Sequence, residues 1–134
     1  MIKNLKFHHI GYAVNDINAT ASFYTNAGWT LSQIYNDKIQ NAKIAFLKRE
    51  GFPLVELVAA VDEKSPVVNI LKKNGVSPYH ICYEVEVMDE AIWQMKQQHF
   101  IPLFKPVEAV ALQNRKICYL YNKEVGLIEF LEKK

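Results

Sequence analysis

The chain has 134 residues, of which 50% are hydrophobic, and its 16 basic and 14 acidic side chains give a net charge of +2. This length suits one compact domain, or two small modules that share a core. No run of about 18 apolar residues occurs, which excludes a spanning helix and argues against a membrane partner. A net charge this small, without a basic run, argues against a nucleic-acid partner.

The N-terminal stretch and the cysteines predict a cytoplasmic location. The N-terminal stretch "MIKNLKFHHIGYAV" lacks the long apolar segment and the cleavage site of a signal peptide. Cys82 and Cys118 form neither a close pair nor a metal-finger spacing. We therefore expect a cytoplasmic location and two reduced thiols in the core.

The first half of the chain is predicted to contain a strand, a helix and three further strands. The strand "HIGYAV" at 9–14 precedes a helical stripe of Ile17, Ala21 and Tyr24, which Asn15 or Asp16 can cap. Strand-like stretches follow near 29–35, at "KIAFL" (43–47) and at "LVELV" (54–58). A linker of about 62–77 then carries a short helix near 67–73, which ends near Gly75.

The second half repeats this order. "HICYEV" at 80–85 matches the first strand, and Met88, Ile92 and Met95 continue the helical stripe, each 71 residues after its counterpart. A strand-like stretch near 100–105 follows. "KICYL" at 116–120 and "LIEFL" at 127–131 match their counterparts at a spacing of 73 residues. Four matched blocks in one order indicate a tandem repeat rather than chance.

The repeat predicts an α+β fold of two tandem βαβββ modules within a single domain spanning 1–134. Module one covers about 1–61, and module two covers about 78–134. One such module has too little core to stand alone, so the two are expected to share one. Two modules related by a pseudo-twofold axis would build one curved eight-stranded sheet around a cleft, with helices on its outer face.

Four polar residues are predicted to face that cleft. Side chains alternate along a strand, so His9 and His80 fall on the less apolar faces of their strands. Glu56 and Glu129 recur inside apolar strands, where a carboxylate is costly to bury unless it is paired or bound to metal. The pseudo-twofold rotation that superposes His9 on His80 also superposes Glu56 on Glu129. The sequence therefore predicts that all four converge.

Two imidazoles and two carboxylates form a mixed nitrogen and oxygen site suited to zinc, nickel, cobalt, manganese or iron. Four protein ligands in an octahedral site would leave two positions for water or substrate. A divalent metal there would act as a Lewis acid on a bound oxygen.

The whole chain resembles the vicinal oxygen chelate superfamily, which includes glyoxalase I, extradiol dioxygenases and bleomycin-resistance proteins. Within it, the sequence is most similar to the methylmalonyl-CoA epimerases. The stretches that carry this resemblance are "HHIGYAVNDINATASFY", "DEKSPVVNILKKNGVSPYHICYEV" and "VGLIEFLEK". The resemblance implies a glyoxalase-like fold and a homodimer.

The resemblance places the metal ligands of the family on His9, Glu56, His80 and Glu129. It implies a reaction in which a base removes the proton alpha to a carbonyl. An epimerase returns that proton on the opposite face, which requires two acid/base groups. Glu129 is the candidate for one of them. Glu84, on the His80 face by strand parity, is the candidate for the second or for a supporting partner.

Three functions follow as alternatives. The first is a metal-dependent epimerase or isomerase that acts on an acyl thioester, such as an acyl-CoA, or on a related 2-substituted oxo acid. The second is a lactoylglutathione lyase of the glyoxalase I type, which acts on a thiol adduct and would use the same four ligands. The third is a resistance-type protein that binds a small molecule without chemistry, and such proteins often lack the four ligands.

Overall fold

The computed structural model describes residue 2 and residues 4–134, and its backbone contacts divide them into two compact units. The first unit is His9–Tyr79. It holds most of β1 (Lys6–Ala13), then α1 (Ile17–Asn26), β2 (Thr30–Leu31), β3 (Tyr35–Asp37), β4 (Ala42–Lys48), β5 (Leu54–Ala60) and α2 (Val67–Asn74).

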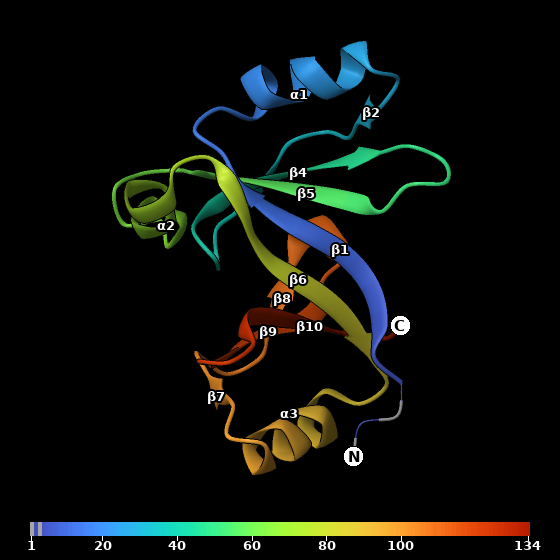
Figure 1. Ribbon diagram of the computed structural model, residues 1–134, viewed down its shortest axis with the longest axis vertical. Helices are drawn as coiled ribbons and strands as arrows, with labels where there is room; N and C mark the ends of the chain where they lie inside the picture. Colours follow the sequence, from blue (N-terminus) through green and yellow to red (C-terminus); the bar gives the residue numbers. More distant parts are fainter. Residues whose placement is uncertain (1, 3) are drawn as a thin grey trace. The chain divides into compact units, whose positions relative to one another are not determined.

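The second unit is His80–Lys134 together with the described residues before His9. It holds most of β6 (Ser77–Val85), then α3 (Met88–Gln97), β7 (Ile101–Pro102), β8 (Val107–Ala109), a short 3₁₀ helix at Val110–Leu112, β9 (Arg115–Asn122) and β10 (Gly126–Glu132). The labels in Figure 1 follow this order.

Both units have the predicted βαβββ order, with one difference in the strand count. The stretch expected near 29–35 is divided into β2 and β3, and the stretch near 100–105 becomes β7, with β8 following it. The described residues therefore form ten strands instead of the expected eight. Each added strand is three residues long and pairs only with its neighbour, β3 with β4 and β8 with β9.

Within each unit the strands have the same spatial order. The first unit follows β2-β4-β5-β1 and the second follows β7-β9-β10-β6. In both, the first and last long strands of the module run parallel, β1 with β5 and β6 with β10. The parallel pair brings together strands that are separated by a helix and the intervening strands of the module.

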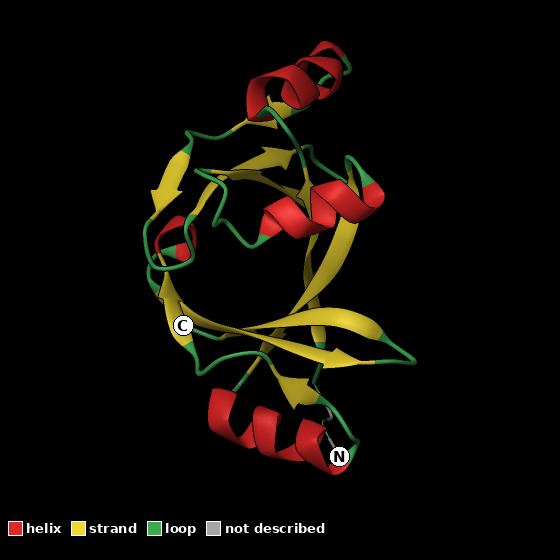
Figure 2. Ribbon diagram, turned by 90° about the vertical axis from the view of Figure 1, so that its left-hand side faces the viewer, coloured by secondary structure: helices red, strands yellow, loops and turns green. Residues whose placement is uncertain are grey.

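One face of each set of strands packs against a helix, as Figures 1 and 2 show. In the first unit the buried cluster on the α1 side comprises Val14, Ile17, Ala21, Ala45, Leu47, Leu57 and Ala59. In the second it comprises Val85, Met88, Ala91, Met95, Phe100, Cys118, Leu120, Ile128 and Phe130. The strand residues in both clusters have the parity opposite to that of the histidines and glutamates. The expected division between a helix face and a polar face is therefore correct.

The helix boundaries follow local chemistry. Asp16 caps α1, because its Oδ1 accepts a hydrogen bond of 3.1 Å from the backbone N–H of Ala19. α3 has no such cap of its own, and the Glu132 side chain accepts from the backbone N–H of Met88 at 2.8 Å. A negative carboxylate at this position also interacts favourably with the positive N-terminal end of the helix dipole. Gly75 ends α2 with a φ of 69°, as the sequence predicted.

Candidate metal centre

The first unit contains a buried pair of one histidine and one glutamate. His9 lies on β1 and Glu56 on β5, and the parallel register places Gly11 opposite Glu56. His9 Nε2 lies 3.5 Å from Glu56 Oε1. The two residues are 0% and 3% exposed. Burial of a carboxylate at this depth requires a compensating polar partner or a metal.

The second unit contains the equivalent pair. His80 lies on β6 and Glu129 on β10, and the register places Cys82 opposite Glu129. His80 Nε2 lies 3.1 Å from Glu129 Oε1, and both residues are buried. The repeat that was visible in the sequence therefore also repeats a three-dimensional contact, although the partners are 47 and 49 residues apart along the chain.

An aromatic ring contacts the histidine in both units. The Phe46 ring meets the His9 ring edge to face, with centroids 5.8 Å apart. The Tyr119 ring meets the His80 ring in the same way at 5.1 Å. Each ring belongs to the residue directly opposite the glutamate on the antiparallel neighbouring strand. Neither ring was predicted from the sequence, although the two occupy the same place in "KIAFL" and "KICYL".

The donor atoms of each pair fit a metal. Two ligands that each lie about 2.1 Å from one ion, at a right angle, are separated by about 3 Å. The observed separations of 3.1 and 3.5 Å are close to this value. Imidazole nitrogen with carboxylate oxygen is a donor set that zinc, nickel, cobalt and manganese accept. Each unit thus contains one histidine–glutamate pair whose donor atoms are spaced as two ligands of one metal ion would be.

The two cysteines, Cys82 and Cys118, are not among the four candidate metal ligands. Both are buried and form no disulfide within the described residues, as expected of reduced core thiols. Burial, and secondarily the charge of Glu129, raises the pKa of Cys118 to about 11. Its Sγ lies 3.2 Å from the backbone carbonyl of Phe104, to which the thiol donates. Cys118 is therefore a protonated core residue at neutral pH.

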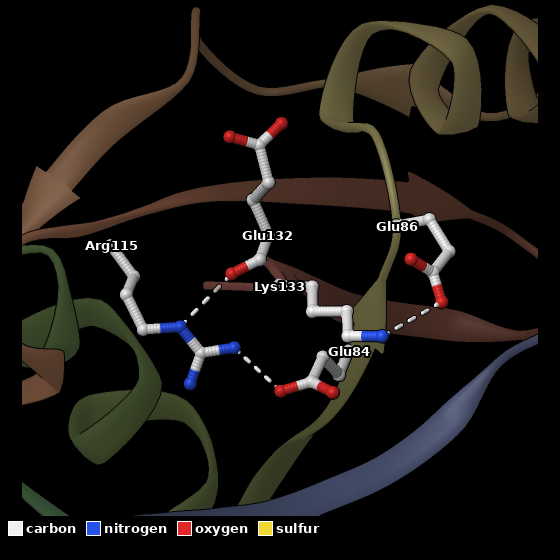
Figure 3. Close-up of polar contacts among 5 residues, drawn as sticks. All are labelled: Glu84, Glu86, Arg115, Glu132 and Lys133. Carbon is white, nitrogen blue, oxygen red and sulfur yellow. Dashed lines mark hydrogen bonds and ion pairs between the residues drawn. The ribbon is translucent and has the colours of Figure 1, made fainter.

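Glu84, the predicted second acid/base group, lies in an ion pair that the sequence did not reveal. Its Oε2 is 2.5 Å from Nη2 of Arg115, whose Nε donates to the backbone carbonyl of Glu132 at 3.0 Å (Figure 3). The hydrogen bond from Arg115 is the main cause that lowers the pKa of Glu84. Glu84 is therefore held as a carboxylate, and its part in proton transfer stays a prediction.

The equivalent positions of the first unit carry no such network. Alanines stand where Glu84, Arg115 and Glu132 stand in the second unit, at Ala13, Ala42 and Ala59, and all three are buried. This difference is visible in the sequence, because alanines and charged residues stand at equivalent positions of the two repeated halves. The partner of Glu84 still required the structure, because Arg115 is 31 residues away in the chain.

Comparison with known proteins identifies the family. Residues 8–119 match the model of the glyoxalase/bleomycin resistance protein/dioxygenase superfamily, and the chain belongs to this superfamily. Among its relatives is the mitochondrial methylmalonyl-CoA epimerase of Homo sapiens. That protein is 25% identical over 123 residues, a match that covers 90% of this chain and 69% of the relative.

Solved structures show the same fold. A methylmalonyl-CoA epimerase from Mycobacterium tuberculosis has a TM-score of 0.87 at 23% identity, covering 100% of this chain and 93% of its own. A methylmalonyl-CoA epimerase in complex with methylmalonyl-CoA and NH4+ has a TM-score of 0.85 at 22% identity, covering 98% and 96%. The expected glyoxalase-like α+β fold and the resemblance to the epimerases are confirmed. Among the residues that the structure describes, no helix is long and apolar enough to cross a bilayer.

Proposed function

We propose that this protein is a divalent-metal-dependent epimerase that moves the proton alpha to the carbonyl of an acyl-CoA thioester of the methylmalonyl type. The observation that carries the proposal is the pair of buried histidine–glutamate contacts, built in the same way in both units. The relatives that are named methylmalonyl-CoA epimerases support the reaction and the substrate class.

In this proposal His9, Glu56, His80 and Glu129 hold one metal ion together. When bound, the ion supplies Lewis acidity that lowers the cost of negative charge on the thioester carbonyl oxygen. The Phe46 and Tyr119 rings restrict the orientations of the two imidazoles. Ligands that are fixed before substrate arrives do not lose side-chain entropy during the reaction.

The chemistry needs one group on each side of the reacting carbon. Glu129 is the proposed base on one side: its carboxylate accepts the alpha proton, and the electron pair of the C–H bond passes into the adjacent carbonyl. A second group then donates a proton to the opposite face of the same carbon. Glu84 is the proposed second group: because Arg115 holds it as a carboxylate, it first takes up a proton from solvent and then donates that proton to the carbon.

Proton exchange tests the proposal. The protein is loaded with Co²⁺, Ni²⁺, Zn²⁺ or Mn²⁺ and incubated with methylmalonyl-CoA in deuterated water. Deuterium should appear at the alpha carbon, and chelation should abolish the exchange. Metal-loaded protein that produces no alpha deuterium above the uncatalysed background overturns the proposal.

The two alternative functions give different results in matched assays. Conversion of a methylglyoxal–thiol adduct to a thioester, without exchange on methylmalonyl-CoA, would assign the lyase. Tight binding of a small molecule with neither reaction would assign a binding protein. A homodimer, which the family resemblance implies, is tested by light scattering of the purified chain.

A further inference from the structure

The face that carries His9 and Glu56 extends across the first unit to an open cavity of about 570 Å³ at the β2 edge. Residues directly opposite each other on neighbouring strands point to the same face. Leu54 is opposite His9 on β1, and Lys48 is opposite Thr30 on β2. Lys48 directly follows and Leu54 directly precedes the last register pair of β4 and β5, Leu47 with Val55, so the two side chains share a face. Thr30, Lys48 and Leu54 all line the cavity.

The cavity also adjoins the candidate metal centre through a shared residue. Phe46 lines the cavity, and its ring contacts the imidazole of His9. Neighbouring strands are about 4.8 Å apart, so the backbone of Lys48 lies about 10 Å from that of His9, two strands away. An arm of about 10 Å would therefore carry a ligand from the candidate metal centre to this cavity.

The polar groups of the cavity are suited to an anion. Lys48 and Arg49 bring two positive charges to the lining, against one carboxylate from Glu50. Arg49 is already occupied, because it donates to the backbone carbonyl of Ala27 at 2.7 Å and lies over the Phe52 ring. Within the described part of the chain, the Lys48 ammonium and the Thr30 hydroxyl make neither an ion pair nor a hydrogen bond.

The second unit provides an internal comparison. Its β7–β9 pair repeats the β2–β4 pair: the backbone N–H of Leu103 donates to Tyr119 as that of Ser32 donates to Phe46, each at 2.9 Å. Ile101 and Tyr121 occupy the positions of Thr30 and Lys48. With the same backbone, one unit carries a cation and a hydroxyl and the other carries apolar and aromatic groups.

We infer that this cavity binds the phosphate-bearing end of a coenzyme A thioester, with Lys48 and Thr30 as phosphate donors. The inference rests on the proposed function, which places the acyl end at the metal centre. A thioester of coenzyme A is asymmetric, with its reactive acyl group at one end and its phosphates at the other. A cavity with a cation and a hydroxyl in one module, at positions where the other carries Ile101 and Tyr121, matches that asymmetry.

Binding of two unreactive thioesters tests the inference without turnover. Propionyl-CoA and propionyl-pantetheine share the acyl group and the thiol arm, but only the first carries phosphates. Isothermal titration should show at least tenfold tighter binding of propionyl-CoA, with an advantage that declines as salt is added. Lys48→Ala should weaken propionyl-CoA about tenfold and leave propionyl-pantetheine unchanged.

Lys43→Ala is the matched control. Lys43 lies on the same strand with opposite parity, opposite Ala59 of the cluster on the α1 side. The Lys43→Ala substitution removes one positive charge from β4, as Lys48→Ala does, and should leave the affinities for propionyl-CoA and propionyl-pantetheine unchanged. The double variant Thr30→Ile, Lys48→Tyr installs the pattern of the second unit and should remove the preference for propionyl-CoA.

Three outcomes distinguish this inference from the proposed function. Alpha-proton exchange together with wild-type affinity of Lys48→Ala for propionyl-CoA overturns the inference and leaves the proposed function standing. A Lys48-dependent preference for propionyl-CoA without any exchange supports the inference and overturns the proposed function. Equal losses in Lys43→Ala and Lys48→Ala would show a general charge effect and would also overturn the inference.

Discussion

Glu84→Gln separates the structural role of the Glu84–Arg115 ion pair from its proposed role in proton transfer. The two side chains are only 21% and 15% exposed, so water screens their attraction less than at an open surface. Arg115 keeps its hydrogen bond to the carbonyl of Glu132 in the variant. The substitution therefore removes one charge and one strong hydrogen bond while preserving the shape of the side chain.

The expected loss in the free energy of unfolding is about 1–2 kcal/mol at pH 7. A hydrogen bond between two charged groups contributes about 1.5–3 kcal/mol, and the neutral amide of the variant can still accept from Arg115. The ion pair lowers the folded-state pKa of Glu84, so its stabilisation is complete above the unfolded-state pKa of about 4.3. It declines as the pH falls through the lowered folded-state value.

Urea denaturation of both proteins at pH 7 and near pH 3 measures this difference, which should shrink at the lower pH. Glu86→Gln is the matched control, because Glu86 pairs with Lys133 at 3.5 Å with both side chains more than half exposed (Figure 3). Its loss should stay below about 0.5 kcal/mol. An equal loss in both variants, or a Glu84→Gln loss that is the same at both pH values, would refute the reasoning.

The same two variants test proton transfer. If Glu84 donates or accepts the second proton, Glu84→Gln should slow epimerisation by about 100-fold or more, while Glu86→Gln stays at the wild-type rate. If Glu84 serves only to hold Arg115, the variant should lose stability and keep its turnover number. Stopped assays at a temperature well below the unfolding midpoint of the variant keep the two effects apart.

Three further predictions follow from the geometry. His9→Ala should lower the metal content of purified protein, measured by plasma mass spectrometry, at least tenfold, and Lys43→Ala should not. His99 has a φ of 68° at the end of α3, where glycine is favoured, so His99→Gly should raise the free energy of unfolding by up to about 1 kcal/mol. Gly28 has a φ of 96°, so Gly28→Ala should lower the free energy of unfolding by about the same amount. Cys118 should resist alkylation at pH 8 in the folded protein, because its pKa of about 11 and its burial leave little accessible thiolate; rapid labelling without unfolding would contradict this.

Much of the fold could be read from the sequence because the informative patterns are local. The helical stripe that begins at Ile17, the cap at Asp16 and the stop at Gly75 all depend on residues within a few positions of one another. Gly28 and His99 are 71 residues apart, which is the spacing of the repeated helices, and both residues adopt positive φ at the end of a helix. Strand parity correctly separated the helix face from the face of His9 and His80.

Sequence alone also identified the four candidate ligands, since a glutamate inside an apolar strand is costly and here it occurs twice. What the sequence could not supply was the register between strands. The 3.5 Å contact of His9 with Glu56, the Phe46 ring beside it and the Arg115 partner of Glu84 all depend on which residues of distant strands lie opposite each other. Side-chain alternation determines the face of a residue, but hydrogen bonding between strands determines its neighbour, and that pairing forms only when the chain folds.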